Sequence, residues 1–219
     1  MEKNIKCAIF DLDGTLMNTI DTIAYYCNET LRELQLPFID TEKYKYFIGN
    51  GAEKLIRRML KFHGIEDEAT FNKAYTYYNK IYNNDPHYLT EIYKGIPELL
   101  KSLREKGFKL GVISNKPHYP TCEIIKKYFG CDLFDAIYGA RDGYPKKPDP
   151  TVPLSIAEEL GATPGECIYI GDTNTDMQTG KAAGFYTIGV LWGFREREEL
   201  ENNDADEIAQ TPLDVLKFI

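Results

Sequence analysis

The stretch Cys7–Leu16, which reads CAIFDLDGTL, places two carboxylates directly after a short apolar run. Apolar runs of this length that are rich in Ile and Phe are typical of strands buried on both faces of a parallel sheet. Gly14 then permits a turn that most residues resist. Ligands of open α/β sheets bind at the carboxyl ends of the strands, so we expect Asp11 and Asp13 to face a binding crevice. The alternative is a plain strand-to-turn junction, where aspartate and glycine are common.

The composition is typical of a folded globular protein without a broad attraction to polyanions. Of the 219 residues, 43% are hydrophobic, and the length allows one large domain or a core with a smaller insert. The formal net charge is -8, from 34 acidic against 26 basic residues. An acidic chain is not attracted to nucleic acid or to an anionic membrane surface. We therefore expect neither as a partner, and a phosphate ligand would need a local positive site.

Cysteine spacing and the apolar segments indicate a reducing compartment. The five cysteines are an odd number, widely spaced and without a CxxC pair: Cys7, Cys27, Cys122, Cys131 and Cys167. Such spacing predicts neither a disulfide framework nor a zinc site, and free thiols are typical of reducing compartments. No segment approaches the ~20 apolar residues of a membrane helix, and the first apolar run is broken at Asp11, unlike a signal peptide. We expect a cytoplasmic protein.

Helical periodicity dominates the chain from residue 17 to residue 90. Apolar residues recur at helical spacing from Ile20 to Leu34. Further helical signals extend over Glu42–Phe47, Ala52–Phe62 and about Asp67–Asn83. No convincing strand occurs between residues 18 and 90. We therefore predict a small all-helical domain over residues 17–90.

After residue 90, helices and strands alternate. Strands are expected over Lys109–Ser114, Asp135–Gly139, Cys167–Gly171 and, as the last strand, Tyr186–Leu191. Helices are expected over about Ile96–Gly107, Tyr119–Phe129, Pro150–Leu160 and Thr175–Ala183. This alternation is typical of a doubly wound parallel sheet. The simplest architecture is an α/β core formed by residues 1–16 and 91–219, with the helical domain inserted after its first strand.

Four polar clusters follow predicted strands. They are Asp11 with Asp13, Ser114-Asn115-Lys116, Lys146-Lys147-Pro148, and Gly171 through Asp176. The carboxyl ends of parallel strands meet at one edge of a sheet, so these clusters should lie around one crevice. Carboxylates this close repel one another unless a cation lies between them, and clustered oxygen ligands suit Mg²⁺. A lysine and a hydroxyl near that ion suit a phosphate group, and the combination indicates phosphoryl transfer.

These clusters resemble the four sequence motifs of the haloacid dehalogenase (HAD) superfamily. The matching residues are Asp11-Leu12-Asp13-Gly14-Thr15, then Ser114, then Lys147, then Gly171-Asp172 with Asp176. The resemblance implies a Rossmann-like α/β core, and the helical insert resembles the small cap domain of the superfamily's phosphatases. Phe47-Ile48-Gly49-Asn50-Gly51-Ala52, together with Ser114-Asn115-Lys116 and Lys147-Pro148, is similar to the phosphoglycolate phosphatase subgroup.

The resemblance also implies a role for each acidic motif residue. Asp11 would be the nucleophile that forms an aspartyl-phosphate. Asp13 would protonate the leaving alcohol and then activate water as a base. Mg²⁺ would be held by Asp11, Asp172 and the backbone carbonyl of Asp13. Asp176 would support the metal site through water or orient the lysine, against the alternative of a charge at a helix N-terminus.

Substrate contacts are expected from both parts of the chain. By resemblance, Ser114 and Lys147 bind the phosphate, and Asn115 assists near the leaving group. Thr15 is expected to stabilise the turn, where its hydroxyl could also meet phosphate. In the cap, Gly49-Asn50-Gly51 is expected to form a loop that faces the substrate, against the alternative of a plain turn between helices.

Several other side chains are predicted to have structural roles. Lys116 is expected at the surface or the rim of the site, and Arg57 and Arg58 on a solvated helix face. Trp192–Arg197 either borders the site or covers the sheet edge, and spacing does not decide between the two. Helix packing with solvated hydroxyls is expected of the insert's tyrosines, Tyr75, Tyr77, Tyr78 and Tyr82.

Together the residues and the resemblance predict a Mg²⁺-dependent phosphomonoester hydrolase acting on a small phosphometabolite, with 2-phosphoglycolate as the first candidate. The dehalogenase branch of the superfamily lacks the second acid, so the presence of Asp13 favours phosphate-ester chemistry. Phosphatases of sugar phosphates, nucleotides or pyrophosphate stay open. A mutase of the β-phosphoglucomutase type carries a cap histidine where this chain has Ile23. A non-catalytic homologue that binds a phosphometabolite is the remaining alternative, and the chain is expected to be a monomer or homodimer.

Overall fold

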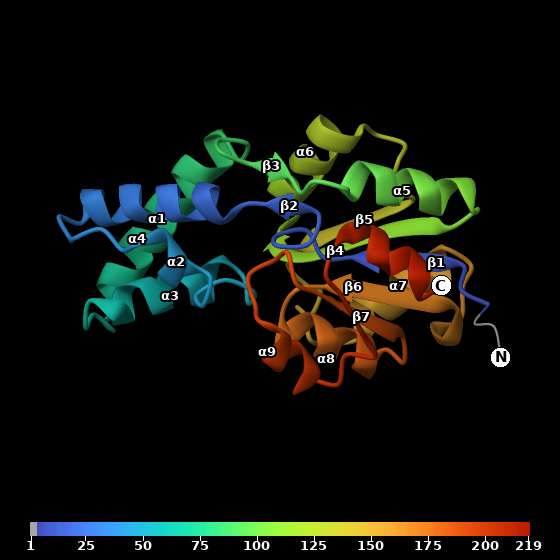
Figure 1. Ribbon diagram of the computed structural model, residues 1–219. Coiled ribbons are helices and arrows are strands. Elements are labelled where there is room, and N and C mark those ends of the chain that lie inside the picture. The colour runs from blue at the N-terminus through green and yellow to red at the C-terminus, as the bar shows by residue number, and fades with distance from the viewer. Residues whose placement is uncertain (1–3) are drawn as a thin grey trace.

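A parallel sheet lies at the centre of the computed structural model, which describes residues 4–219 (Figure 1). All neighbouring strands of this sheet run in the same direction. In spatial order they are β5 (Ala136–Ala140), β4 (Lys109–Pro117), β1 (Cys7–Phe10), β6 (Cys167–Gly171), β7 (Tyr186–Val190) and β8 (Glu207–Ala209). The doubly wound α/β fold predicted from the alternation is therefore confirmed.

Helices cover both faces of the sheet. One face is covered by α5 (Ile96–Glu105), α6 (His118–Phe129) and the short 3₁₀ helix η2 (Pro212–Lys217). The other is covered by α7 (Thr151–Glu159) and α8 (Asn174–Ala182), with the 3₁₀ turn η1 (Pro164–Glu166) before β6 and α9 (Arg197–Glu201) after β7. Two hydrophobic clusters result, one on each side of the sheet.

The first strand is buried from both sides. It lies between β4 and β6, and all four of its residues are inaccessible to solvent. Successive side chains point to opposite faces, so Ala8 and Phe10 join one cluster while Cys7 and Ile9 join the other. This placement explains why the run is continuously apolar, and it brings Asp11 to the carboxyl edge of the sheet.

Four further helices form a separate group beyond one end of the sheet (Figure 1). They are α1 (Ile20–Glu33), α2 (Thr41–Tyr44), α3 (Ala52–Phe62) and α4 (Glu68–Asn84). These helices pack around their own hydrophobic cluster, and Phe194, from the loop after β7, also belongs to it. We call this group the cap and the sheet with its helices the core. The division into 1–16 with 91–219 and 17–90 stays a prediction, and its residues 1–3 lie outside the described chain.

A short antiparallel ribbon joins the cap to the core. Its two strands, β2 (Met17–Asn18) and β3 (Glu91–Ile92), are the points where the chain enters and leaves the cap. The sequence analysis did not predict this ribbon, and Asn18 falls in the stretch expected to contain no strand. A strand of two residues has no periodicity from which it could be predicted.

Two element ends differ from the expectation by three residues, and one strand was not expected. Strand β4 continues to Pro117, beyond the predicted end at Ser114. Helix α2 ends at Tyr44, before the predicted Phe47. Tyr186–Leu191 does not contain the last strand, because β8 pairs with β7 on its far side. Strand β8 has only three residues and follows an acidic segment, so it lacks the long apolar run that marks the other strands.

Candidate active site

A cavity of about 50 Å³ lies between the carboxyl edge of the sheet and the cap. A single water needs about 10–15 Å³ measured in this way, so the cavity suits a small ligand. We call its two sides the core wall and the cap wall. The core wall consists of Asp11, Asp13, Ser114, Asn115, Lys116, Pro117, Lys147 and Thr173. The cap wall consists of Ile23, Ile48, Gly49, Gly51, Ala52, Leu55, Tyr78, Asn79, Tyr82 and Asn83.

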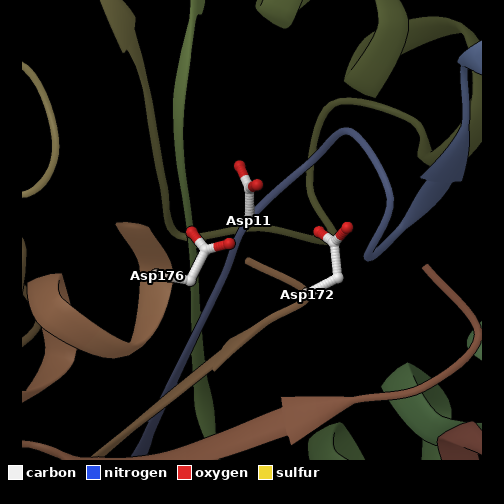
Figure 2. Close-up of side chains that lie close together, drawn as sticks. All are labelled: Asp11, Asp172 and Asp176. Carbon is white, nitrogen blue, oxygen red and sulfur yellow. The ribbon is translucent and has the colours of Figure 1, made fainter. Parts of the chain in front are cut away.

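Three buried carboxylates meet beside the core wall. Asp11, Asp172 and Asp176 each contribute an oxygen atom to a cluster whose members lie within 4.8 Å of one another, and Figure 2 shows the three side chains converging. Burial, and next the charge of Asp176, raise the pKa of Asp172 to about 7. The same two causes raise the pKa of Asp11 well above its usual value, although Lys147 opposes them. Such a cluster is stabilised by positive charge.

Lys147 supplies part of that charge. Its Nζ lies 2.8 Å from Asp11 Oδ1 and 2.7 Å from Asp176 Oδ1. Burial would lower the pKa of Lys147, but Asp11 and then Asp176 raise it well above its usual value. The neighbouring Lys146 is exposed. Of the two adjacent lysines, Lys147 is therefore the one that lies in the site.

Asp176 accepts hydrogen bonds both from Lys147 and from the N-terminus of its own helix, α8. One carboxylate oxygen accepts the hydrogen bond from Lys147. The other accepts from the backbone N–H of Thr173, at 3.0 Å, and from its hydroxyl, at 2.7 Å. This is a capping box at the start of α8. The two expected alternatives, orienting the lysine and stabilising a helix N-terminus, are both seen in the geometry.

A tight loop after β7 fixes Asp172. The backbone N–H of Phe194 donates to Asp172 Oδ2 at 2.9 Å, and the Thr15 hydroxyl donates to Oδ1 at 3.0 Å. The Trp192 indole N–H donates to the Thr15 carbonyl. A Cβ on Gly193 would lie 2.3 Å from the Asp172 Cβ, so only glycine fits there without a shift. The segment 192–197, left open by the sequence, thus borders the site. Thr15 does not line the cavity, and its expected contact with phosphate stays a prediction.

Asp13 is paired with a lysine that the sequence analysis assigned to the surface. Lys116 Nζ lies 3.1 Å from Asp13 Oδ1, which also accepts from the Thr19 hydroxyl at 2.7 Å. The Lys116 side chain is only 5% exposed, so the expected rim or surface position is wrong. Tyr82 is likewise more than a packing residue with a solvated hydroxyl, because its hydroxyl accepts from Lys116 at 2.6 Å.

The signals for these two residues were weak in the sequence. Because β4 runs on to Pro117, Lys116 belongs to a strand end at the same sheet edge as Asp11. The charged residue directly after Ser114-Asn115 was the available signal, and the unpredicted length of β4 concealed it. Nothing in the sequence pairs Tyr82 with a residue 34 positions away.

The loop Gly49-Asn50-Gly51 lies against the core. The Asn115 amide donates to the Gly49 carbonyl at 3.0 Å and to the Lys147 carbonyl at 3.2 Å, and it accepts from the Lys147 N–H. The Asn50 amide donates to the Thr175 hydroxyl at 3.1 Å. Gly49 and Gly51 line the cavity and Asn50 does not. The loop is thus more than a turn, while substrate binding by these residues and by Asn115 stays a prediction.

Two arginines hold this loop in place. Arg58, from α3, donates to the Phe47 carbonyl and to Asn50 Oδ1. Arg195, from the loop after β7, donates to the Lys45 and Ile48 carbonyls. Arg58 is therefore not on a solvated face as expected, whereas Arg57 is partly exposed and pairs with Glu53 and Glu68. Arg195 links the core directly to the cap.

The donor set beside the core wall fits a hard divalent cation. Asp11 Oδ1 is buried and receives no hydrogen bond, although the Lys147 ammonium lies beside it. Within residues 4–219, no hydrogen bond reaches the carbonyl oxygen of Asp13 either. Carboxylate and carbonyl oxygens are the ligands that Mg²⁺ prefers, with water and substrate oxygens filling its octahedron. Asp176 is a poorer candidate ligand, because both of its oxygens already accept hydrogen bonds from Lys147 and Thr173.

Comparison with known proteins decides the family. The sequence profile of the haloacid dehalogenase-like hydrolases matches residues 8–190. The chain belongs to this family. A phosphoglycolate phosphatase from Aquifex aeolicus is 33% identical over 98% of the chain and 97% of its own length, and one from Nitrosospira multiformis is 31% identical over 98% and 96%. A crystal structure of a proposed phosphoglycolate phosphatase from Lactobacillus delbrueckii subsp. bulgaricus has a TM-score of 0.92, with 27% identity and 98% and 97% of the two chains covered.

These findings confirm the resemblance drawn from the four motifs, including its phosphatase subgroup. The sequence of this chain is similar to those of phosphoglycolate phosphatases over nearly its whole length. A separate observation concerns membranes: among residues 4–219, no helix has both the length and the apolar character needed to cross a bilayer.

Proposed function

We propose that the protein is a Mg²⁺-dependent phosphomonoester hydrolase that acts through an aspartyl-phosphate on Asp11. The observation that carries this proposal is the placement of Asp11 and Asp13 on the wall of one cavity, with Lys147 2.8 Å from the first carboxylate and Lys116 3.1 Å from the second. A nucleophile and a proton donor thereby face the same cavity, where the first can attack phosphorus and the second can reach the leaving oxygen. Mg²⁺, when bound by Asp11, Asp172 and the Asp13 carbonyl, would neutralise charge on the phosphoryl oxygens.

The chemistry divides into two displacements. First, a carboxylate oxygen of Asp11 forms a bond to phosphorus while the bond from phosphorus to the ester oxygen breaks, and Asp13 gives its proton to the leaving alkoxide. Next, Asp13 takes a proton from water, the water oxygen attacks phosphorus, and the bond to Asp11 breaks to release inorganic phosphate. Lys147 and Ser114 hold the phosphoryl group during both steps.

The preferred substrate is a small phosphomonoester, and 2-phosphoglycolate is our first candidate. Two relatives that match the chain over nearly its whole length are phosphoglycolate phosphatases, and the cavity of about 50 Å³ suits a small ester. Ile23, in the position of the mutase histidine, is buried and lines the cavity. An alkyl side chain cannot transfer a proton, so hydrolysis is favoured over phosphoryl shuttling. Sugar phosphates, nucleotides and pyrophosphate are the competing substrates.

A substrate panel tests this proposal. The purified protein with Mg²⁺ should release phosphate from an aryl phosphate and should have its highest kcat/KM with 2-phosphoglycolate, and EDTA should abolish both activities. A higher kcat/KM for a sugar phosphate, a nucleotide or pyrophosphate would contradict the substrate. Turnover that survives Asp11→Ala would contradict the mechanism, and no turnover of any ester would favour a binding homologue.

We also propose a cytoplasmic location, because all five cysteines are free in the structure. A monomer or homodimer stays the prediction for the oligomeric state.

A further inference from the structure

One buried lysine contacts the acid Asp13 but takes no part of its own in the two displacements described above. Lys116 lies at the end of β4, and its side chain is 5% exposed. Its ammonium pairs with Asp13 at 3.1 Å and donates to the Tyr82 hydroxyl at 2.6 Å, and it lies 4.7 Å from the centre of the Tyr82 ring. Burying a lysine is costly unless its charge is used. The core and the cap therefore meet at a charged group that faces the cavity.

The ammonium of Lys116 has one N–H left. A lysine ammonium carries three donors, and within the described chain Asp13 and Tyr82 are its only polar partners. The Tyr82 hydroxyl accepts from the lysine, so its own proton points away from the ammonium and remains available to a ligand. An ammonium and a hydroxyl, both with a donor to spare, thus lie together on the cavity surface.

Three other cations near the cavity are already engaged. Lys147 is bound to Asp11 and Asp176. Arg58 donates to Asn50 and to a backbone carbonyl of the cap loop, and Arg195 donates to two more such carbonyls. No residue of the cap wall carries a charge. Lys146 has its ammonium near Gly51 but is exposed and does not line the cavity. Among the cations that line the cavity, Lys116 is therefore the one left to pair with a second anionic group on a substrate.

The position of Asp13 indicates which part of the substrate this would be. An acid that protonates the leaving oxygen must lie beside that oxygen, so the next atoms of the leaving group also lie near Asp13. Lys116, in contact with the Asp13 carboxylate, is adjacent to these atoms. Asn79 and Asn83, on the same helix as Tyr82, line the cavity and add amide groups without any hydrogen bond within residues 4–219.

We propose that Lys116 and Tyr82 together bind a carboxylate on the leaving group, and so select small phosphomonoesters in which a carboxylate is attached to the ester carbon. This inference rests on the proposed hydrolysis and deepens it by naming the group that recognises the substrate. Selection then depends on the cap being closed, because only the closed arrangement brings the Tyr82 hydroxyl to the lysine.

The test compares two esters that differ in charge but leave as similar alkoxides, 2-phosphoglycolate and 2-hydroxyethyl phosphate. Removing a charge-assisted hydrogen bond from a buried site reduces affinity by about 10- to 100-fold. Lys116→Met should therefore lower the ratio of kcat/KM for the first ester to that for the second by about this factor. If Lys116 serves only to hold Asp13, both esters lose equally and the ratio does not change, which would overturn the proposal.

Two further variants keep the experiment decisive. Lys106→Met removes an exposed charge at the C-terminal end of α5, away from the cavity, and should leave the ratio unchanged; an equal drop there would show a general charge effect and overturn the proposal. Tyr82→Phe keeps the ring and removes the hydroxyl, and it replaces Lys116→Met if that variant does not fold. It should lower the ratio by about two- to tenfold, and an unchanged ratio would contradict the pairing.

Failure of this inference is distinguishable from failure of the proposed function. If wild-type protein hydrolyses neither ester, the proposed function fails before the variants are compared. If it hydrolyses both and the ratio is the same in wild type and in Lys116→Met, the hydrolase stands and the carboxylate site is overturned.

Discussion

The two walls of the cavity differ sharply in chemistry. The core wall carries four charged residues, Asp11, Asp13, Lys116 and Lys147, and two more carboxylates, those of Asp172 and Asp176, lie beside Asp11. The cap wall is formed by aliphatic, aromatic and amide side chains with no charge. The core wall can therefore perform the bond-breaking steps, whereas the cap wall excludes water and limits the size and shape of the substrate. The walls contact each other at two points, where Lys116 donates to the Tyr82 hydroxyl and where the Asn115 amide donates to the Gly49 carbonyl.

The largest effect is expected when the nucleophile is removed from the core wall, because the difference between the two walls rests on it. Asp11→Asn should lower kcat by at least about 10⁴-fold, because covalent catalysis is lost with the attacking oxygen. The charge-matched Asp40→Asn, at the exposed N-terminus of α2, should leave kcat unchanged. Initial rates of phosphate release measure both, and a loss below tenfold for Asp11→Asn would show that the core wall works in another way.

Removing the acid from the same wall should give a loss that depends on the substrate. Asp13→Asn cannot protonate the leaving oxygen, so kcat for an alkyl phosphate should fall by about 10²- to 10⁴-fold. An aryl phosphate, whose leaving group needs no proton, should lose much less in the rate of its first displacement, measured as a burst of released phenol. Equal losses for the alkyl and aryl esters in that step would contradict the acid role.

The crowded carboxylates predict an unusual dependence of stability on pH. Burial and Asp176 raise the pKa of Asp172 to about 7 in the folded state, whereas an unfolded aspartate has a pKa of about 3.9. The folded protein then binds more protons than the unfolded one between these values, so the metal-free protein should become less stable as pH rises, by about 2–4 kcal/mol from pH 4 to pH 7.

Mg²⁺ should offset this loss, because it replaces the proton as the partner of the carboxylates. The increase in Tm on adding Mg²⁺ in excess of EDTA should be larger at pH 8 than at pH 5, by roughly 5–10 °C. Differential scanning calorimetry at the two pH values measures it. An equal increase in Tm at both pH values would show that Mg²⁺ does not act by neutralising the charge of these carboxylates.

A smaller effect is expected where the cap wall is held to the core. Arg195 is 8% exposed and donates to two carbonyls of the cap loop, so Arg195→Ala should lower kcat/KM by about tenfold, mainly through KM. The nearby Arg197 is half-exposed, and among residues 4–219 its one ion-pair partner is Glu201. Arg197→Ala should have almost no effect, since surface ion pairs contribute little. Equal kinetics in the two variants would show that closure does not depend on Arg195.

The difference between the two walls also explains which parts of the site could be predicted from the sequence. Asp11 and Asp172 each follow an apolar strand and Ser114 lies in the last part of another, so the topology of a parallel sheet brings them to one edge without further information. The doubly wound fold and the core half of the site were predictable for this reason. Family resemblance added the separation of roles between Asp11 and Asp13.

The cap side could not be predicted in the same way. The contact of Lys116 with Tyr82 joins a strand to a helix of the other group, and helical periodicity gives no information on how two groups of elements pack together. The role of Phe194 as a donor to Asp172 depends on a backbone N–H, which has no sequence signal at all. The short strands β2, β3 and β8 were missed because two or three residues carry too little periodicity.

The most direct test of the proposed mechanism is to trap the phosphoryl group on Asp11. Asp13→Asn should accept phosphate from an aryl ester yet release it slowly, because the second displacement lacks its base. Mass spectrometry of acid-quenched Asp13→Asn protein should then find a phosphoryl group on Asp11, and the variant that also carries Asp11→Asn should remain unmodified. Turnover without any adduct, or an adduct on a residue other than Asp11, would contradict the account.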